Sequence, residues 1–281
     1  MEPRRQVEIG NKRRREKSDK LWSVKNQPVS IFLSEPFGIE YACRPTWGIL
    51  ERSYIRMFGL LDLPNRLRAR IVMPELSTLL PKKVLDLGSG TGCYSFHLSR
   101  DNHVDVSGVE IDERRISESR HIGKCLGRGN LKFYCGSAAE CLQDFPSGAF
   151  EMVLAIEVLQ YLIDVPLILQ EIHRVLTPGG ILLGHVPVLG YLRTQERTFF
   201  DDDKIQQMLS GANLQIMKII STFGGIPQKL CTLYDFLSRS RVLVGVLFPL
   251  ILIASSAFRV DHPKGQYRFF VARKPATEIG L

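Results

Sequence analysis

The chain contains the stretch Lys83-Val-Leu-Asp-Leu-Gly-Ser-Gly-Thr-Gly-Cys-Tyr94, which reads as a buried strand, a glycine turn and the start of a helix. The apolar run around Asp86 suits a strand that is covered on both faces. Gly88, Gly90 and Gly92 allow a positive φ and let a ligand approach the backbone closely. We therefore expect an open α/β sheet with a ligand at the carboxyl end of this strand.

The spacing of the glycines narrows the class of ligand. A dinucleotide fold prefers G-x-G-x-x-G and a P-loop needs G-x-x-x-x-G-K-[ST], whereas this turn reads G-x-G-x-G without a following Lys-Ser or Lys-Thr. The next strand, at 104–110, ends in Glu110, whose carboxylate can accept both hydroxyls of a ribose. Asp112 is an alternative, although an acidic residue at that place also suits the N-terminus of the next helix. These motifs predict a nucleoside site at the ends of two neighbouring strands.

Strand and helix patterns alternate along the chain. Alternation with short turns predicts an α/β fold with a Rossmann-like, doubly wound parallel sheet, right-handed crossovers and helices on both faces. We expect strands at 83–87, 104–109, 131–135, 150–155, 181–186, 214–222 and 266–272. We expect helices at 46–60, 65–80, 92–100, 113–125, 138–143, 164–176 and 201–211, with Pro64 as a break and Pro178-Gly179-Gly180 closing the helix before the fifth strand.

Five blocks of sequence resemble the class I S-adenosylmethionine-dependent methyltransferases, and more narrowly the broad small-molecule methyltransferase family. They read VLDLGSGTG, GVEID, GSAAE, FEMVLAIEVLQYL and LTPGG-ILLG, and they extend over about residues 80–225. The resemblance implies a seven-stranded sheet, mostly parallel with an antiparallel last strand, and S-adenosyl-L-methionine as the cofactor. It leaves open whether the acceptor is a lipid or a soluble metabolite and whether O, N or C is methylated.

The resemblance also assigns residues to the cofactor. It places the glycine loop and Asp86 at the methionyl end, Glu110 at the ribose hydroxyls, Ile111 against adenine, and Ser137 at the adenine edge, where many relatives carry Asp. The complete set of expected cofactor-binding residues is Asp86, Gly88, Ser89, Gly90, Gly92, Glu110, Ile111, Ser137, Ala138, Ala155 and Ile156.

Acid–base candidates lie at the mouths of the fourth and fifth strands. Tyr161 stands where many relatives carry His, so a base that uses that His is missing here. Glu157 and His185 remain as candidates, and a hydrogen-bonded structural role is the simpler interpretation of His185. The expected catalytic set is Glu157, Tyr161 and His185. A phenol or carboxylate acceptor ionises readily and would need little help from any of them.

The segments outside the core carry much of the formal net charge of +8. Residues 1–25 contain nine Lys and Arg against four acidic residues, and we interpret 1–30 as a basic, disordered arm. Residues 31–80 read as a helical cap, which in related enzymes folds over the cofactor. Residues 81–275 form the expected methyltransferase core, which an apolar insertion at 224–265 interrupts.

The insertion contains seventeen consecutive residues without a charge, at 242–258, with Pro249 among them and Arg239, Arg241 and Arg259 around them. Three interpretations fit this run: a helix that lies in a membrane interface, a buried lid over the pocket, and a short helix that spans a membrane. The basic ends of the chain would favour an anionic membrane surface as a partner.

Other classes of function fit less well. Residues 155–158 read Ala-Ile-Glu-Val and not the [DN]-P-P-[YF] motif of nucleic-acid amino-methyltransferases, so we expect no specific nucleic acid partner. The six cysteines show no C-x-x-C pair or zinc spacing, so we expect no metal site. The polar, basic start has no signal-peptide pattern, which favours a cytoplasmic protein, with peripheral attachment to the membrane as a further expectation. A non-catalytic scaffold or regulator that binds S-adenosylmethionine is the alternative to an enzyme.

Overall fold

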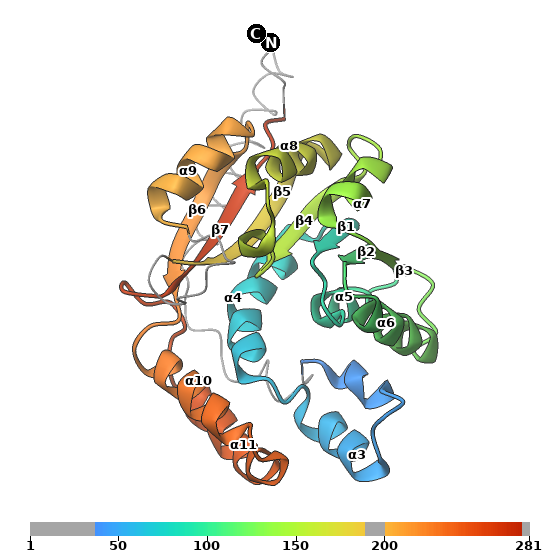
Figure 1. Cartoon of the computed structure of the whole chain (residues 1–281), viewed down its shortest axis with the longest axis vertical. Helices are drawn as coiled ribbons and strands as arrows, with labels where there is room; N and C mark the ends of the chain where they lie inside the picture. Colours follow the sequence, from blue (N-terminus) through green and yellow to red (C-terminus); the bar gives the residue numbers. More distant parts are fainter. Residues whose placement is uncertain (1–36, 189–199, 277–281) are drawn as a thin grey trace, which may run out of the picture. The chain divides into compact units, whose positions relative to one another are not determined.

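A computed structural model of the chain describes residues 37–188 and 200–276. Its centre is a seven-stranded sheet with the strand order β3-β2-β1-β4-β5-β7-β6 (Figure 1). The strands are β1 (Lys83–Leu87), β2 (Asp105–Glu110), β3 (Leu131–Cys135), β4 (Phe150–Ile156), β5 (Leu176–Pro187), β6 (Gln215–Thr222) and β7 (Tyr267–Arg273). Only β7 runs against its neighbours β5 and β6, which confirms the expected mixed sheet with an antiparallel last strand. The basic arm expected at 1–30 lies outside the described residues.

The strand bounds agree with the expected ones to within one residue, except at β5. This strand begins at Leu176 because that residue pairs with Phe150, and the register between β4 and β5 shifts directly after this pair. The run at 178–180 therefore lies in the irregular first part of the strand. The preceding helix ends earlier than expected, at Val175, so our expectation that this run closes the helix was wrong.

Helices cover both faces of the sheet, as expected. One face is covered by α7 (Ala138–Asp144), α8 (Val165–Val175) and α9 (Asp202–Gly211). The other face is covered by α4 (Leu63–Leu79), α5 (Cys93–Leu98) and α6 (Glu113–Cys125). Alternation along β1 decides which side chain faces which layer: Leu85 and Leu87 pack in the first core, whereas Val84 packs in the second. Asp86 follows the direction of Val84 and points towards α5.

Two distant segments of the chain meet at the carboxyl ends of the parallel strands. The first supplies η1 (Ile39–Cys43), α3 (Ile49–Phe58) and α4, and the second supplies α10 (Gly225–Leu237) and α11 (Arg241–Ser256) (Figure 1). They share one apolar core, to which Leu67, Phe223 and Phe248 belong. The Tyr54 hydroxyl of α3 also donates a hydrogen bond to the Gly245 carbonyl of α11. The cap and the apolar insertion thus form one continuous structure.

The ends of α4 and α11 follow from local sequence. Pro64 lies in the first turn of α4, where proline is well tolerated, and the Asp62 side chain caps the helix by accepting from the Asn65 N–H at 2.9 Å. The Ser240 side chain caps α11, a helix of 16 residues that keeps Pro249 in its interior. Among the residues that the structure describes, we find no helix whose length and apolar character would let it cross a membrane.

Candidate functional site

The three glycines after β1 all have a positive φ, of 69° at Gly88, 59° at Gly90 and 86° at Gly92. A Cβ at Gly88 would lie 2.4 Å from the Val158 side chain, and a Cβ at Gly92 would lie 2.9 Å from the Phe133 ring. These two glycines are therefore required for packing of the loop. A Cβ at Gly90 would meet no atom within 4 Å. The backbone of Gly90 thus borders open space, unlike the backbones of Gly88 and Gly92.

The carboxylate of Glu110 joins this loop to the end of β2. Its Oε2 accepts a hydrogen bond from the Gly90 N–H at 2.9 Å. Its Oε1 accepts from the N–H groups of Ile111 and Asp112, at 3.0 and 3.1 Å. A carboxylate offers about four acceptor positions. The three backbone bonds leave an acceptor position on the oxygen that faces the loop, where a ribose hydroxyl would fit.

The residues expected around adenine have different environments. Ile111 is an exposed apolar side chain, as a surface that packs on a flat ring requires. The Ser137 hydroxyl donates to the Glu140 carboxylate at 2.7 Å and accepts from the Glu140 N–H at 3.2 Å, so it caps α7. Ala138 lies in the first turn of the same helix. Asp112 likewise caps α6. The geometry therefore leaves Ile111 free to meet a base and engages Ser137 and Asp112 in helix capping.

Asp86 lies buried behind the glycine loop. Its carboxylate accepts a hydrogen bond from the Ser95 hydroxyl of α5 at 2.6 Å. Burial raises the pKa of Asp86 to about 6, and the bond from Ser95 opposes this shift only in part. The side chain fixes the start of α5 relative to β1, so it supports the loop from behind.

At the carboxyl end of β4 the chain takes a strained conformation. Ala155 and Ile156 pack in the two opposite cores, so only their backbone borders the site. Glu157 follows with a φ of 57°, which is unfavourable for a residue with a side chain. Its N–H donates to the His185 carbonyl at 2.9 Å. Leu80, Asn213 and Phe223 also have a positive φ, so the strain marks Glu157 as a candidate only together with its position at the carboxyl end of β4.

Glu157 is the centre of a hydrogen-bonded network. Its Oε1 lies 2.5 Å from the His185 Nδ1, and the other ring nitrogen of His185 lies 2.9 Å from the Thr222 hydroxyl. The Gln160 amide donates to Oε2 at 3.0 Å. The Arg68 Nε, from α4, lies 4.0 Å from Oε1. Arg68 of α4, Gln160 of the turn after β4 and His185 of β5 therefore contact this carboxylate, whereas Thr222 of β6 contacts only His185.

The pKa shifts fix the protonation state of this network. Burial alone would raise the pKa of Glu157, but the bond from His185 and the charge of Arg68 outweigh it and hold the pKa below its usual value. Burial lowers the pKa of His185 although Glu157 opposes this. Glu157 is therefore ionised near neutral pH and His185 is neutral. The Nδ1–H of His185 donates to the Glu157 carboxylate, and the other ring nitrogen of His185 accepts from the Thr222 hydroxyl.

The three catalytic candidates differ in access. His185 is fully buried, with both ring nitrogens engaged and its ring stacked on Tyr267 at 5.1 Å. It suits a positioning role and not direct contact with an acceptor. Tyr161 is exposed in η2 (Leu159–Tyr161). Glu157 keeps a partly exposed side chain at the strand end and is the best placed of the three for proton transfer.

The structure adds Tyr94 and Gln160, which sequence reasoning missed, to Ser89, which belongs to the expected cofactor-binding set. Three buried side-chain atoms around the glycine loop and Glu157 lack a hydrogen-bond partner: Ser89 Oγ, Tyr94 Oη and Gln160 Oε1. Tyr94 is only 7% exposed, and its hydroxyl lies within electrostatic range of Arg68, Asp86 and Glu157. Buried polar atoms are almost always paired. The sequence offered one signal for Tyr94, namely its aromatic ring two positions after the last glycine of the loop.

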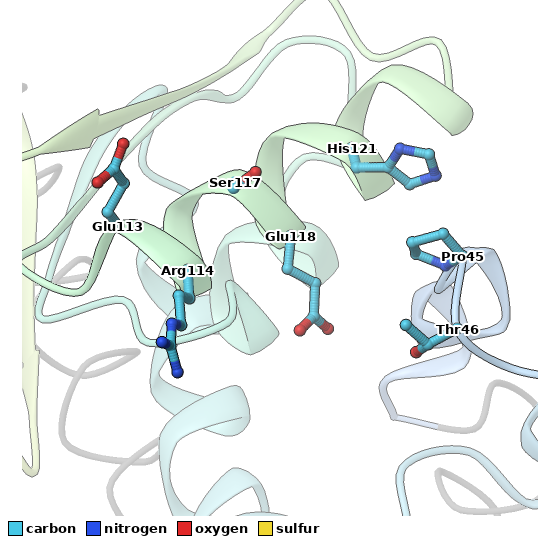
Figure 2. A pocket seen from close by; sticks show the side chains of 7 residues that line it. All are labelled: Pro45, Thr46, Glu113, Arg114, Ser117, Glu118 and His121. Atoms are coloured by element: carbon cyan, nitrogen blue, oxygen red, sulfur yellow. The ribbon is translucent and has the colours of Figure 1, made fainter.

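A separate pocket of about 530 Å³ lies between α6 and the loop that precedes α3. Figure 2 shows Glu118 and His121 projecting from α6 on the side where Pro45 and Thr46 lie. The residues that line it are Pro45, Thr46, Glu113, Arg114, Ser117, Glu118 and His121. None of them belongs to the glycine loop or to the ends of β4 and β5. We therefore assign the candidate site by its convergent polar groups and not by this volume.

The comparisons with known proteins show the family of the chain. A family model described as a methyltransferase domain matches residues 81–221, which is half of the chain. The chain belongs to the class I S-adenosylmethionine-dependent methyltransferases. The matched range begins just before β1 and ends within β6, so it contains the glycine loop, Glu110 and the strained Glu157.

Individual relatives of this methyltransferase are distant. Ajmaline N-methyltransferase of Rauvolfia serpentina is 24% identical over 191 residues, which cover 64% of this chain and 64% of that protein. The chain thus covers less than two thirds of the length of this relative and of two other curated relatives that it matches. Two solved structures share the fold, at 16% and 15% identity. Phosphoethanolamine N-methyltransferase 2 of Haemonchus contortus, in complex with S-adenosyl-L-methionine, has a TM-score of 0.54 over 69% of this chain and 49% of that one. A methyltransferase of Methanosarcina mazei has a TM-score of 0.52 over 73% and 98%.

The residues of the methyltransferase fit S-adenosylmethionine. The open space beside Gly90, the acceptor position on Glu110 and the exposed Ile111 suit a nucleoside. The unpaired Ser89 and Tyr94 hydroxyls suit the amino and carboxylate groups of a methionyl chain. The cofactor that the family implies therefore has complementary partners in this chain.

Proposed function

We propose that this methyltransferase transfers the methyl group of S-adenosylmethionine to a small-molecule or lipid-like acceptor at a membrane surface. The observation that carries the proposal is the convergence of Arg68, Gln160 and His185 on the carboxylate of the strained Glu157, at the sheet edge where the glycine loop also lies. The names of two similar proteins support a small acceptor, since they specify ajmaline in one case and phosphoethanolamine in the other.

In this proposal Glu110 accepts from the ribose hydroxyls and Ile111 packs on adenine. The backbone of Gly90 and the hydroxyls of Ser89 and Tyr94 hold the methionyl end, while Asp86 supports the loop from behind. Ala155 and Ile156 contribute backbone groups on the opposite side of the same end. The turn at Ser137 and Ala138 borders the adenine edge, with the Ser137 hydroxyl already engaged in capping α7.

The bound cofactor supplies a methyl carbon on a sulfonium, and the transfer is an in-line displacement at that carbon, so alignment is the main task of the protein. Glu157 would orient the acceptor and take its proton. His185 holds the Glu157 carboxylate in place through its Nδ1–H, and Thr222 fixes the tautomer of His185. Because the pKa of Glu157 is lowered, this carboxylate is a weak base and suits an acceptor that ionises readily.

The experiment is a transfer assay with purified full-length protein, methyl-deuterated S-adenosylmethionine, and cell extract separated into lipid and polar fractions. We expect mass spectrometry to find a product that is heavier by one labelled methyl group. The test variant is Glu157→Gln, which keeps the shape of the side chain but removes the charge that orients the acceptor, and it should lower the yield by about tenfold or more. The fraction that contains the product decides between a lipid and a soluble acceptor.

The alternative function, a scaffold that binds the cofactor without turnover, predicts a different result. Calorimetry would show S-adenosylmethionine binding, but neither fraction would gain the label. That combination would contradict methyl transfer and leave cofactor binding intact.

A further inference from the structure

The apolar helix α11 has two different apolar sides. Val244, Phe248 and Ile251 face the core that α11 shares with α4 and α10, and Phe248 is completely buried. The opposite side consists of Val242, Leu243, Val246, Leu250 and Ile253, which we call the outer face of α11. Val246 and Ile253 are each 69% exposed, and Leu250 is 63% exposed. At about 100° per residue, the outer face spans an arc of roughly 100° that lies opposite the core side.

Neighbouring helices extend this apolar surface. On α10, the exposed side chains of Ile226, Lys229, Leu233 and Phe236 recur at helical spacing and form one stripe. On α3, Leu50 and Met57 are exposed and lie on the side of Tyr54, the residue that bonds to α11. Exposed apolar side chains gathered on neighbouring helices mark interaction sites.

Two exposed cations lie beside the stripe of α10, and the exposed acidic residues of α3 and α10 are Glu51 and Asp235. No charged residue occurs between 242 and 258. Lys229 and Arg239 are exposed beside the apolar stripe, and the Arg239 guanidinium lies 5.9 Å from the Phe236 ring. The nearby Asp235 lies on the other side of α10, about 180° away from Ile226 at helical spacing. An apolar face with a cationic margin is complementary to an anionic lipid surface.

We propose that the outer face of α11, together with the exposed stripe of α10, docks onto an anionic lipid bilayer with α11 parallel to the membrane plane. The proposal deepens the function proposed above and rests on it for the link to a lipid-like acceptor. The helix would run about 24 Å along the surface, with its outer side chains about 5–10 Å into the boundary between head groups and acyl chains. Its core side remains packed on α4.

A second copy of the chain is a poorer occupant of this face. The face consists of aliphatic side chains without hydrogen-bonding groups that would fix the register of two copies. A symmetric contact would also bring Lys229 and Arg239 of both copies together, and like charges repel. A fluid bilayer requires no register, and its anionic head groups attract both cations.

Docking on this face would place the catalytic carboxylate close to the membrane. Leu67 of α4 packs in the core that contains Phe248 of α11. The next residue, Arg68, lies 4.0 Å from Glu157. The membrane-facing helix and the proposed acceptor site are therefore joined by one short helical segment, which suits an acceptor that is drawn from the lipid phase.

The test is flotation of full-length protein with phosphatidylcholine vesicles that contain or lack phosphatidylserine. We expect co-flotation with the anionic vesicles at low salt. Val246→Glu/Leu250→Glu should lower the bound fraction by about tenfold or more, because it places two charges in the apolar layer. The matched control is Leu167→Glu on α8, at an apolar side chain that is also exposed (49%), and it should bind like the parent.

Lys229→Gln/Arg239→Gln should weaken binding about 25-fold at low salt, and this difference should vanish at high salt.

A second measurement covers the case in which the glutamate variant does not fold. Leu250→Trp keeps the face apolar, and brominated phosphatidylcholine in the vesicles should quench the fluorescence of the new indole. Several results would overturn the proposal: a parent that does not float, a glutamate variant that floats like the parent, or no quenching at Leu250→Trp. A dimer in light scattering that the glutamate variant disrupts, without vesicle binding, would assign the face to a second copy.

Failure of the docking proposal can be distinguished from failure of the proposed function. Calorimetry with S-adenosylmethionine is run on the same preparations. Protein that binds the cofactor but does not float contradicts docking alone. Protein that floats without binding the cofactor contradicts the proposed function alone.

Discussion

At Gly90, the effect of a substitution on backbone conformation can be measured separately from its effect on ligand binding. Its φ of 59° disfavours any side chain, and a Cβ there would point into open space. We predict that Gly90→Ala lowers stability by about 1–2 kcal/mol through the left-handed backbone and also weakens S-adenosylmethionine binding about tenfold or more. Thermal unfolding and calorimetry measure the two effects.

Gly127→Ala provides a matched control for this prediction. Gly127 has a φ of 65° and the same open surroundings, but it lies at the far end of α6 from Glu110. The alanine there should cost similar stability and leave cofactor binding unchanged. Equal binding by both variants would show that no ligand approaches Gly90.

Asp86 carries a stability cost that depends on pH. Its pKa rises from 3.8 to about 6 in the folded protein, because burial disfavours the carboxylate. The folded state therefore binds more protons than the unfolded state between these values. A shift of this size corresponds to about 3 kcal/mol, which destabilises the fold above pH 6 and disappears below pH 3.8.

From this sign we predict that Asp86→Asn raises the free energy of unfolding at pH 7 by up to about 3 kcal/mol, with the gain lost below about pH 4. Urea unfolding across this pH range measures it. Asp112→Asn is the control, because asparagine caps a helix as well as aspartate does, and it should change stability by less than about 0.5 kcal/mol. A variant of Asp86 that is less stable than the parent at pH 7 would refute the buried-charge argument.

At the scale of single elements, α11 shows what the sequence alone does not reveal. The run at 242–258 is apolar on all sides, so its pattern could not indicate which side packs on the protein. The structure assigns Phe248 to the core and Leu250, two residues later, to the surface. The distinction depends on the position of α4, which is distant in sequence.

Truncation of a side chain on the core side of α11 should lower the free energy of unfolding much more than truncation on the outer face. Phe248→Ala should lower the free energy of unfolding by about 3–5 kcal/mol, because it leaves a cavity in the core shared with Leu67. Leu250→Ala should change it by less than about 0.5 kcal/mol. Chemical denaturation of both variants measures the difference. Equal effects would mean that α11 does not pack as described.

The fold could be predicted from the sequence more completely than the site, and the reason is physical. The glycine loop and the sheet follow from local patterns, because apolar strands and left-handed turns constrain their own residues. Arg68 and Thr222 escaped prediction, since Arg68 reaches Glu157 and Thr222 reaches His185 only after α4 and β6 pack at the same sheet edge. The strain at Glu157 and the unpaired Tyr94 hydroxyl likewise exist only in the folded chain.

At the scale of the whole molecule, the described core, cap and insertion form one arrangement around the carboxyl ends of the parallel strands (Figure 1). The core presents the glycine loop, the cap contributes Arg68, and the insertion covers the cap with α11. The Tyr41 hydroxyl of η1 also bonds to Thr91 of the loop at 2.8 Å. The cofactor loop and the cap are therefore joined by a hydrogen bond, and we propose that methyl transfer takes place between this loop and Glu157.

A crystal structure of the full chain with S-adenosylhomocysteine tests that claim most directly. We predict that the ribose hydroxyls lie within hydrogen-bond distance of Glu110, and that Ser89 Oγ and Tyr94 Oη gain partners on the ligand. The thioether sulfur should point towards Glu157. A ligand bound in the pocket beside α6, or a glycine loop without ligand at saturating concentration, would contradict the account.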